Sequence, residues 1–367
     1  MRILHFVSTP ATWSGVMSVI MNYYRHIDRT QLQFDFLCFQ RSEDNYEDEI
    51  QKMGGKVYYV RKPGSSLQSV CDLRDFFIQH KGEYSCFHNH EVYLSFLLKP
   101  VSQKYGISHF VIHSHATQYS DKKLNAIRNR ILCFPIRYMN CEKLACSRAA
   151  SEFLYGDITR SEDDAPRVVH NAIDCERYRF CQETRNRIRA DLQLEDRVVI
   201  GHVGRFEKQK NHKFLIDCFA YFHQWNPNSV MLLIGSGSLL HEIKQYVQDK
   251  DLDKYVLFLG SRSDVWDYYQ AMDQFWLPSL YEGLPVAVVE AQTSGLPCLI
   301  SDTVTTEAKI LEETLFLKLQ DGAEKWSRKA MEVLEKEKRE CGVIAVKNAG
   351  FDIQQESQRL QAFYLGE

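Results

Sequence analysis

Short apolar segments alternate with amphipathic segments along most of the chain. An apolar strand over residues 2–7 opens it, and a loop then leads into a helix with apolar residues at helical spacing. Strands are predicted at 2–7, 33–39, 56–60 and 107–115 in the first half, and at 198–204, 229–235, 255–260, 274–278 and 297–300 in the second. Amphipathic helices separate the strands of the second half, a pattern typical of a parallel sheet covered on both faces.

The alternation restarts near residue 198, after a polar stretch over 174–196 that is predicted to be the linker. A chain of 367 residues also suits two domains better than one hydrophobic core. The predicted fold class is therefore α/β, with two doubly wound Rossmann-like domains. We expect an N-terminal domain over 1–175, a C-terminal domain over 176–345, and a last helix within 346–367 that packs back on the N-terminal domain.

Composition narrows the classes of function. Hydrophobic residues make up 44% and charged residues 25%, as in globular proteins, and a net charge of -3 does not indicate a nucleic-acid binder. The 11 cysteines include no C-x-x-C pair, which favours free thiols in a reducing cytosol. The chain shows no signal peptide and no apolar run long enough to span a bilayer. We expect a cytoplasmic protein that meets a membrane only at its inner surface.

The basic residues are unevenly distributed. Residues 95–150 contain nine Lys or Arg and two Asp or Glu, a balance of +7, so the rest of the chain carries about -10. Four apolar residues there recur at helical spacing and four basic residues surround them: Leu124, Ile127, Ile131 and Phe134, and Lys122, Lys123, Arg128 and Arg130. This segment is either a core-facing helix with a solvated face or a docking face for anionic lipid.

Four segments of the second half follow predicted strands, at the edge where open α/β sheets bind ligands. They are 204–211, 235–237, 260–264 and 278–291. In the first, Arg205 and Lys210 could both reach a diphosphate, although a solvated basic loop is the other interpretation. The glycines of the second let a phosphate or ribose approach a helix N-terminus, but they are also ordinary turn residues. In the third, Ser263 or Asp264 could simply cap a helix.

Glu290 is the most informative residue of the fourth segment. It lies in an otherwise apolar helix over 286–291, and burying an unpaired carboxylate costs free energy. A ribose diol would supply the missing partner. Glu282 precedes the same helix beside Gly283, and Pro285 suits its first turn.

Other chemistries are less well supported. Neither half contains G-x-G-x-x-G, which disfavours a nicotinamide enzyme. Asp251 and Asp253 form a D-x-D, but within a highly charged run that is predicted to be a solvated connector.

The chain also contains two H-x-H pairs, His88 with His90 and His113 with His115. Residues two apart on a strand share a face, so each pair could in principle bind zinc. Cys86 would share the face of the first pair, but no fourth ligand is evident. We therefore expect no metal site, and a structural role for at least two of these four histidines.

The string EGLPVAVVE resembles the signature of retaining family 4 glycosyltransferases of the GT-B fold. HVGRFEKQKN resembles the phosphate-binding loop of that family, and VVHNAIDCERY its interdomain linker, with Ala172 where Gly is usual. HNHE and VIHSHA resemble His-containing segments of its capsule and exopolysaccharide branch. The resemblance covers essentially the whole chain and implies two facing Rossmann-like domains with the active site in the cleft between them.

The resemblance also implies roles for single residues. Arg205 and Lys210 would hold the donor diphosphate, Glu290 the ribose hydroxyls, and Glu282 the transferred sugar. The backbone of the segment from Leu284 through Pro285 to Val286 would add amides to the phosphate site, and Gly235 would admit a phosphate or ribose. Arg262 lies in the loop that would border the base, and Gly15 would let a substrate phosphate approach. His115, or failing it His113, would lie near the transferred sugar. The family often has two adjacent glycines where this chain has Ser14 and Gly15, so the acceptor side is less well defined.

The expected function is that of a metal-independent, retaining hexosyltransferase that uses a nucleotide sugar as substrate and no cofactor, with UDP favoured by family habit. A lipid-linked saccharide is the expected acceptor, in bacterial surface polysaccharide synthesis at the inner, anionic face of the plasma membrane. A GT-B-fold sugar-nucleotide epimerase is one alternative. A non-catalytic subunit of a transferase complex is another, but it would be expected to have lost Arg205, Lys210, Glu282 or Glu290, and all four are present.

Overall fold

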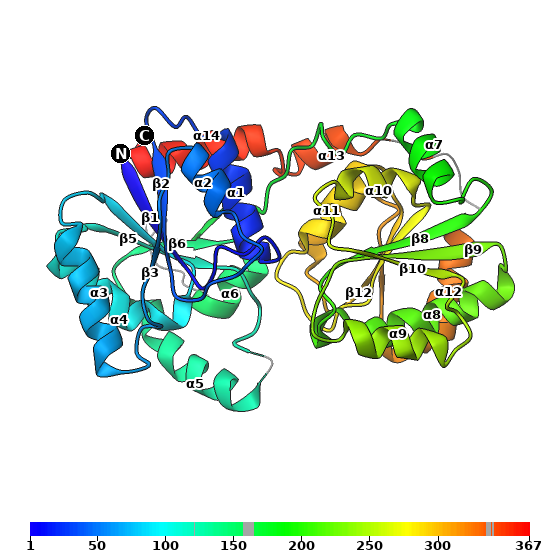
Figure 1. Ribbon diagram of the computed structural model, residues 1–367, viewed down its shortest axis with the longest axis horizontal. Helices are drawn as coiled ribbons and strands as arrows, with labels where there is room; N and C mark the ends of the chain where they lie inside the picture. The colour runs from blue at the N-terminus through cyan, green and yellow to red at the C-terminus, as the bar shows by residue number, and fades with distance from the viewer. Residues whose placement is uncertain (121, 157–164, 335–338, 340) are drawn as a thin grey trace. The chain divides into compact units, whose positions relative to one another are not determined.

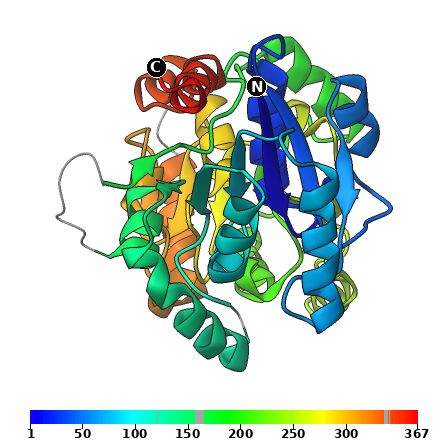
Figure 2. The same cartoon turned by 90° about the vertical axis from the view of Figure 1, so that its left-hand side faces the viewer.

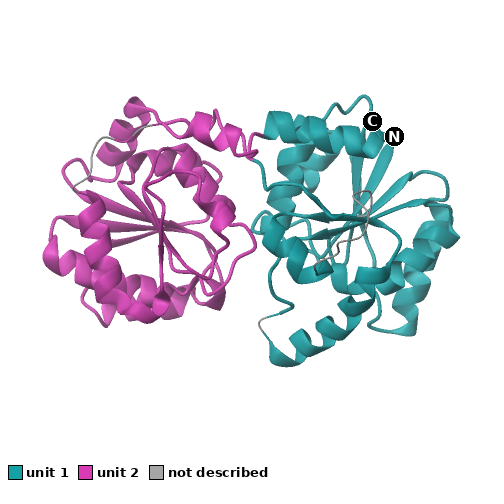
Figure 3. Ribbon diagram, turned by 180° about the vertical axis from the view of Figure 1, so that it is seen from behind, with its two compact units in different colours: residues 1–172, 353–367 teal, residues 173–352 magenta. Residues whose placement is uncertain are grey.

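The computed structural model describes residues 1–120, 122–156, 165–334, 339 and 341–367, and these form two compact units. Figure 3 colours unit 1, residues 1–172 with 353–367, and unit 2, residues 173–352. The second boundary falls at 353 and not at 346, because α13 (Val343–Asn348) packs on α11 (Val286–Thr293) within unit 2. Each unit is an α/β layer structure around a parallel sheet, so the predicted fold class is confirmed.

Unit 1 holds a sheet of seven parallel strands in the order β3-β2-β1-β4-β5-β6-β7 (Figure 1). Its strands are β1 (Arg2–Val7), β2 (Gln33–Cys38), β3 (Val57–Tyr59), β4 (Cys86–Asn89), β5 (His109–Ser114), β6 (Glu142–Ala145) and β7 (Arg167–Val168). Its helices are α1 (Gly15–His26), α2 (Glu47–Lys52), α3 (Leu67–Gln79), α4 (Ser95–Lys104), α5 (Lys123–Cys133), α6 (Arg148–Tyr155) and α14 (Ile353–Leu365). The strand order 3-2-1-4-5-6 is that of doubly wound nucleotide-binding domains.

Unit 2 holds a sheet of six parallel strands in the order β10-β9-β8-β11-β12-β13. Its strands are β8 (Val198–Val203), β9 (Ser229–Ile234), β10 (Val256–Gly260), β11 (Gln274–Leu277), β12 (Cys298–Ser301) and β13 (Leu315–Leu317). Its helices, besides α11 and α13, are α7 (Gln182–Asp191), α8 (His212–Trp225), α9 (Leu240–Gln248), α10 (Val265–Ala271) and α12 (Gly322–Leu334). Five of these strands overlap the five that apolar periodicity predicts, and the short β13 was missed.

The stretch predicted to be a linker contains helix α7, which packs on α10 within unit 2. That part of the prediction is wrong. Arg189 of α7 is buried and donates to the carbonyl of Ala271 at 2.8 Å and to the carboxylate of Asp273 at 3.3 Å. Polar composition suggested a solvated connector, but these polar side chains are held by ion pairs and backbone carbonyls.

Helix α14 returns to unit 1 and lies beside α1, as Figures 1 and 2 show. Its apolar positions Ile353 and Leu360 are buried, which fixes the helix against the unit. Tyr364, near its end, is buried over the central strands of the sheet and contacts His88 of β4. The last helix therefore contributes a polar group to the interior of unit 1.

Candidate functional site

The predicted donor segments of unit 2 all follow the carboxyl ends of strands β8, β9, β10 and β11. Backbone hydrogen bonds join the first three: Gly204 donates to Ile234, Phe206 to Ser236, and Gly235 to Gly260. A Cβ on Gly235 would lie 2.1 Å from the carbonyl oxygen of Gly204. Gly235 is therefore required by the close approach of two loops of the chain itself, whatever ligand they hold.

Lys210 and Glu282 lie together at this edge. The Lys210 Nζ is 2.5 Å from the Glu282 Oε1, and only 14% and 9% of the two side chains are exposed. Ser279 donates to the same carboxylate at 2.8 Å and Gln209 at 3.2 Å. The cation predicted to bind phosphate and the carboxylate predicted to face the sugar thus neutralise each other, so their roles are coupled and not separate.

Arg205 lies on the loop between β8 and the short helical turn 208–210. Its side chain is exposed, and no hydrogen bond or ion pair to it occurs among the described residues. Its neighbour Phe206 is buried and anchors the loop. Arg205 is therefore available to an anion, whereas Lys210 must be shared with Glu282.

Two histidines that the sequence analysis missed lie close to this loop. His202 is the fifth residue of β8 and contacts the carbonyl oxygen of Trp276 at 2.8 Å, and His212 begins α8. Burial lowers the pKa of His202 to about 4 and that of His212 to about 2, and the nearby Lys210 acts in the same direction. Both rings are therefore neutral near pH 7. For His202 the sequence contained a signal, because a histidine inside an apolar strand is unusual.

Glu290 has partners within the protein. The hydroxyl of Tyr178 donates to one carboxylate oxygen at 2.7 Å and that of Tyr269 to the other at 2.8 Å. The two tyrosines therefore supply the partners that the sequence argument sought in a ribose diol, and the predicted contact with the ribose stays a prediction. Burial raises the pKa of Glu290, while the two hydroxyls act against that shift. A carboxylate accepts about four hydrogen bonds, so capacity for a ligand remains.

The segment from Leu284 through Pro285 to Val286 leads into α11, which begins at Val286. Pro285 occupies the N-cap position, and it has no side-chain acceptor with which to cap the first amides of the helix. The helix start therefore offers amides and a partial positive charge to an anion.

Arg262 is held within its own loop. Two of its guanidinium nitrogens donate to the carboxylate of Asp264 at 2.8 and 2.7 Å, and the group lies over the ring of Tyr268. Asp264 stands at the N-cap of α10 but makes no capping hydrogen bond with its side chain. The alternative of a simple helix cap is therefore wrong for Asp264.

In unit 1, Gly15 is the exposed first residue of α1, and the Oγ of Ser14 accepts a hydrogen bond from the amide of Met17. A Cβ on Gly15 would meet nothing within 4 Å. The chain itself therefore does not require glycine there, unlike at Gly235. The predicted approach of a substrate phosphate stays a prediction.

His113 and His115 lie at the carboxyl end of β5, in a row of neighbouring imidazoles. His113 is buried, while His115 is partly exposed and its Nε2 lies 2.8 Å from the Nδ1 of His90. Burial lowers the pKa of His115 to about 4, so its imidazole is neutral near pH 7. The row also includes His5, which the sequence analysis missed although it lies within an apolar strand.

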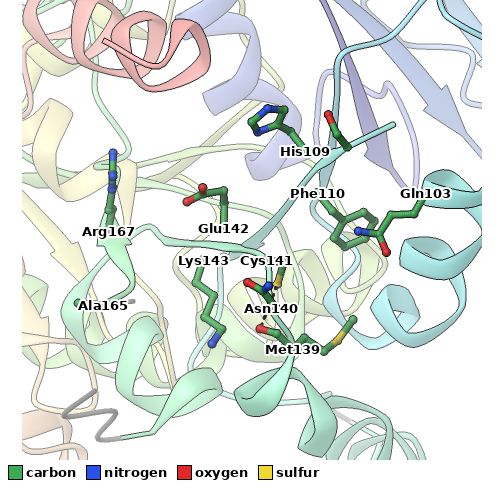
Figure 4. Close-up of a pocket in the computed structure, with 11 residues that line it drawn as sticks. Gln103, His109, Phe110, Met139, Asn140, Cys141, Glu142, Lys143, Ala165 and Arg167 are labelled. Carbon is green, nitrogen blue, oxygen red and sulfur yellow. Dashed lines mark hydrogen bonds between the residues drawn. The ribbon is translucent and has the colours of Figure 1, made fainter. Parts of the chain in front are cut away.

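Figure 4 shows a pocket of unit 1 that contains no predicted site residue. Its wall includes His109, Glu142 and Arg167, which are the first residues of β5, β6 and β7. It is thus at the amino edge of the sheet, opposite the edge where doubly wound sheets bind ligands. We do not assign the donor or acceptor to it.

Helix α5 exposes its apolar side chains. The exposed fractions are 82% for Leu124, 60% for Ile127, 66% for Ile131 and 60% for Phe134. The helix turns Asn129 and Cys133 inward instead, and the Asn129 amide donates to the carbonyl of Tyr119 at 2.9 Å. The alternative of a core-facing helix is therefore wrong for these four positions. In the described part of the chain no helix has the length and apolarity needed to cross a bilayer.

Comparisons with known proteins agree with the geometry. The family model described as group 1 glycosyl transferases matches residues 184–344, most of unit 2. EpsF of Bacillus subtilis (strain 168), named as a glycosyltransferase, is 34% identical over 309 residues, which cover 83% of this chain and 80% of EpsF. The UDP-Gal:alpha-D-GlcNAc-diphosphoundecaprenol alpha-1,3-galactosyltransferase of Escherichia coli is 25% identical over 305 residues, 79% of this chain and 76% of that one.

Among solved structures, Anabaena HepE in complex with UDP-glucose matches with a TM-score of 0.81 at 18% identity, over 100% of both chains. That similarity shows the fold. Together with the identity to EpsF over most of both sequences, it supports one conclusion: the chain belongs to the group 1 glycosyltransferases, family 4 of the GT-B fold.

Proposed function

We propose that this protein is a retaining hexosyltransferase that moves a sugar from a UDP-sugar to a lipid-linked saccharide during synthesis of a bacterial surface polysaccharide. The observation that carries the proposal is the cluster at the carboxyl edge of unit 2, where the exposed Arg205 lies on the same loop as the Lys210–Glu282 pair. The donor class follows from that cluster, and the acceptor class from helix α5.

Glycosyl transfer breaks the bond between C1 of the sugar and the diphosphate oxygen, and forms a bond from C1 to an acceptor hydroxyl oxygen, whose proton passes to the leaving diphosphate. The leaving diphosphate gains negative charge as the bond breaks. Arg205 and the start of α11 stabilise that charge where it develops, without a metal ion at the diphosphate. Arg205 suits this role because its guanidinium has no partner among the described residues.

Lys210 and Glu282 act as a unit in this proposal. A diphosphate that attracts Lys210 weakens its hold on Glu282, which then accepts hydrogen bonds from hydroxyls of the transferred sugar. Glu290, already oriented by Tyr178 and Tyr269, accepts from the ribose. The nucleotide and the sugar are thus recognised by carboxylates whose geometry the chain sets before the donor binds.

The acceptor side of the proposal rests on helix α5. Its exposed apolar residues are accompanied by four exposed basic residues, Lys122, Lys123, Arg128 and Arg130. A helix with this composition lies in the interface of an anionic bilayer, and each basic residue contributes about 1 kcal/mol there. The acceptor named for the Escherichia coli relative is a diphosphoundecaprenol, which is lipid-linked. The His-containing segments that resemble the capsule and exopolysaccharide branch support polysaccharide synthesis.

The test is a donor screen with and without acceptor. Purified protein is incubated with single UDP-sugars and with a polyprenyl-diphosphate-linked saccharide, and the product is analysed by NMR. We expect one UDP-sugar to give a glycosylated lipid that keeps the anomeric configuration of the donor. Conversion of a UDP-sugar without acceptor would favour the epimerase, and failure to bind any UDP-sugar would favour the non-catalytic subunit.

A further inference from the structure

Five histidines form one row on the central strands of unit 1. His5 lies on β1, His88 on β4, His90 just after β4, His113 on β5 and His115 just after β5. Strands β1, β4 and β5 are neighbours in the sheet, and His5 pairs with His88 in register. Because side chains two residues apart on a strand share a face, all five rings gather on the same face of the sheet.

The rings contact one another through their nitrogens. The Nδ1 of His90 lies 2.8 Å from the Nε2 of His115, and the Nε2 of His90 lies 3.0 Å from the Nδ1 of His5. The Nε2 of His88 lies 3.2 Å from the Nδ1 of His113. Two imidazole nitrogens this close are either a donor and an acceptor or two ligands of one metal ion.

The hydrogen bonds leave the row incompletely satisfied. The Nε2 of His113 is buried, and among the residues that the structure describes it has no hydrogen-bond partner. The Nε2 of His5 is in the same situation. A buried ring nitrogen without a partner lowers stability, and the row therefore has two nitrogens that its own contacts do not use.

We propose that unit 1 binds a divalent transition-metal ion of the Zn²⁺ or Co²⁺ type through His90, His113 and His115. One ring nitrogen from each of the three lies within 4.8 Å of those of the other two. Tetrahedral Zn²⁺ with nitrogen ligands at 2.0–2.1 Å sets its ligands about 3.3 Å apart. The His90 and His115 nitrogens, 2.8 Å apart, need to open by only about 0.5 Å to reach that spacing.

The protons of the row suit this assignment. If the Nε2 of His113 ligates, its Nδ1–H donates to the Nε2 of His88. The Nδ1–H of His88 then donates to the hydroxyl oxygen of Tyr364, 2.5 Å away on α14. Metal-bound histidines characteristically donate their second ring N–H to such a partner, which holds the ring in place. His88 and Tyr364 would therefore be positioning residues behind the ligand His113.

His90, His113 and His115 are better placed than the deeper group of His5, His88 and His90. His5 and His88 of the deeper group are buried, whereas His115 is partly exposed. An ion can therefore reach the outer group from solvent, and water would complete the fourth coordination position. Since every residue of the site belongs to unit 1, metal binding does not depend on the donor site of unit 2.

The experiment uses the full-length protein with any affinity tag removed, stripped with a chelator and titrated with Co²⁺. We expect one Co²⁺ per chain with the visible absorption of a tetrahedral site, and its displacement by one equivalent of Zn²⁺. His113→Ala and His115→Ala should each lower the affinity at least tenfold, and Tyr364→Phe about tenfold through His113. His109→Ala is the matched control, because that histidine is exposed at the start of β5.

Circular dichroism and the thermal midpoint of each stripped variant test folding separately. If His113→Ala does not fold, His115→Ala serves in its place, because that side chain is partly exposed. UDP affinity, measured on the same samples, should be the same for parent and variants, so a failure of the metal site is distinguishable from a failure of the donor site. Less than one equivalent of metal in the parent, or parental affinity in both ligand variants, overturns the proposal.

Discussion

The carboxyl edges of the two sheets carry different chemistry. In unit 2 the edge is ionic, with Lys210 paired to Glu282 and Arg205 exposed beside them. In unit 1 it is a row of neutral imidazoles, where burial lowers the pKa of His115 to about 4. The same fold therefore presents charge at one edge and uncharged lone pairs at the other. Charge suits a diphosphate leaving group, while neutral lone pairs suit a metal ion or a hydroxyl.

Glu282 offers the strongest test of the ionic edge. In Glu282→Ala the transferred sugar would lose its carboxylate, so we expect kcat to fall about a hundredfold to a thousandfold. UDP affinity should not fall, because Lys210 no longer shares its charge with Glu282. Steady-state kinetics with isothermal titration of UDP measures both. Glu282→Gln retains the shape and tests the charge. Full turnover in both variants would contradict the assignment of Glu282 to the sugar.

The proposed lipid-facing role of α5 would separate unit 1 from unit 2 in a second way. Changing Lys122, Lys123, Arg128 and Arg130 together to Gln should weaken binding to anionic vesicles by about 4 kcal/mol, several hundredfold, since each contributes about 1 kcal/mol. UDP affinity should not change. Vesicle co-sedimentation at low and high salt measures the loss, because salt screens such binding.

The matched control changes four exposed basic residues of unit 2 to Gln, Lys254, Lys309, Lys325 and Arg328. If net charge alone governed vesicle binding, the two quadruple variants would bind anionic vesicles equally. Leu124→Ser with Ile131→Ser then tests the apolar part of the same face. Vesicle binding equal to that of the parent in all variants would return α5 to the role of a solvated helix.

Arg205→Ala should weaken UDP binding by about 1.5–3 kcal/mol, roughly tenfold to a hundredfold, through the loss of a charged hydrogen bond. Removing the Arg205 guanidinium leaves no partner unpaired among the described residues. Lys210→Ala is less suitable, because it leaves Glu282 without its cation. Lys208→Ala is the control, as another exposed cation of the same loop. Equal UDP affinity in Arg205→Ala and Lys208→Ala would show that a general positive charge, and not Arg205, attracts the nucleotide.

The smallest expected effect concerns the titration of Glu290. Burial raises its pKa, so the folded protein holds this proton more tightly than the unfolded chain does. Its contribution to stability is then fully present below about pH 4.3, the ordinary value for Glu, and is lost as pH rises through the raised pKa. Glu290→Gln should therefore gain thermal stability relative to the parent as pH increases from about 4.3. A difference between their melting temperatures that does not vary with pH would contradict this.

Periodicity predicted the second sheet more completely than the first, because β4, β6 and β7 of unit 1 and β13 of unit 2 were not among the predicted strands. The five predicted strands of the second half overlap β8 to β12, and the loops after four of them contain the residues predicted to bind the donor. The prediction of a linker over 174–196 relied on polar composition and is wrong. The segment contains α7, and its Arg189 is buried and bonded to a backbone carbonyl of unit 2. On α5 the apolar residues are exposed instead of buried. Helical spacing shows that residues share a face of the helix, but it does not show what that face contacts.

The alternation of apolar strands with amphipathic helices, together with the EGLPVAVVE string, determined the fold class, the family and the edge of the second sheet where the predicted donor residues lie. These features are local, so a single sequence contains them. Pairings between distant residues depended on the tertiary structure: Lys210 with Glu282, Tyr178 with Glu290, and His5 with His90. Periodicity records which way a side chain points, whereas its partner is set by strand order and by packing between segments far apart in the chain.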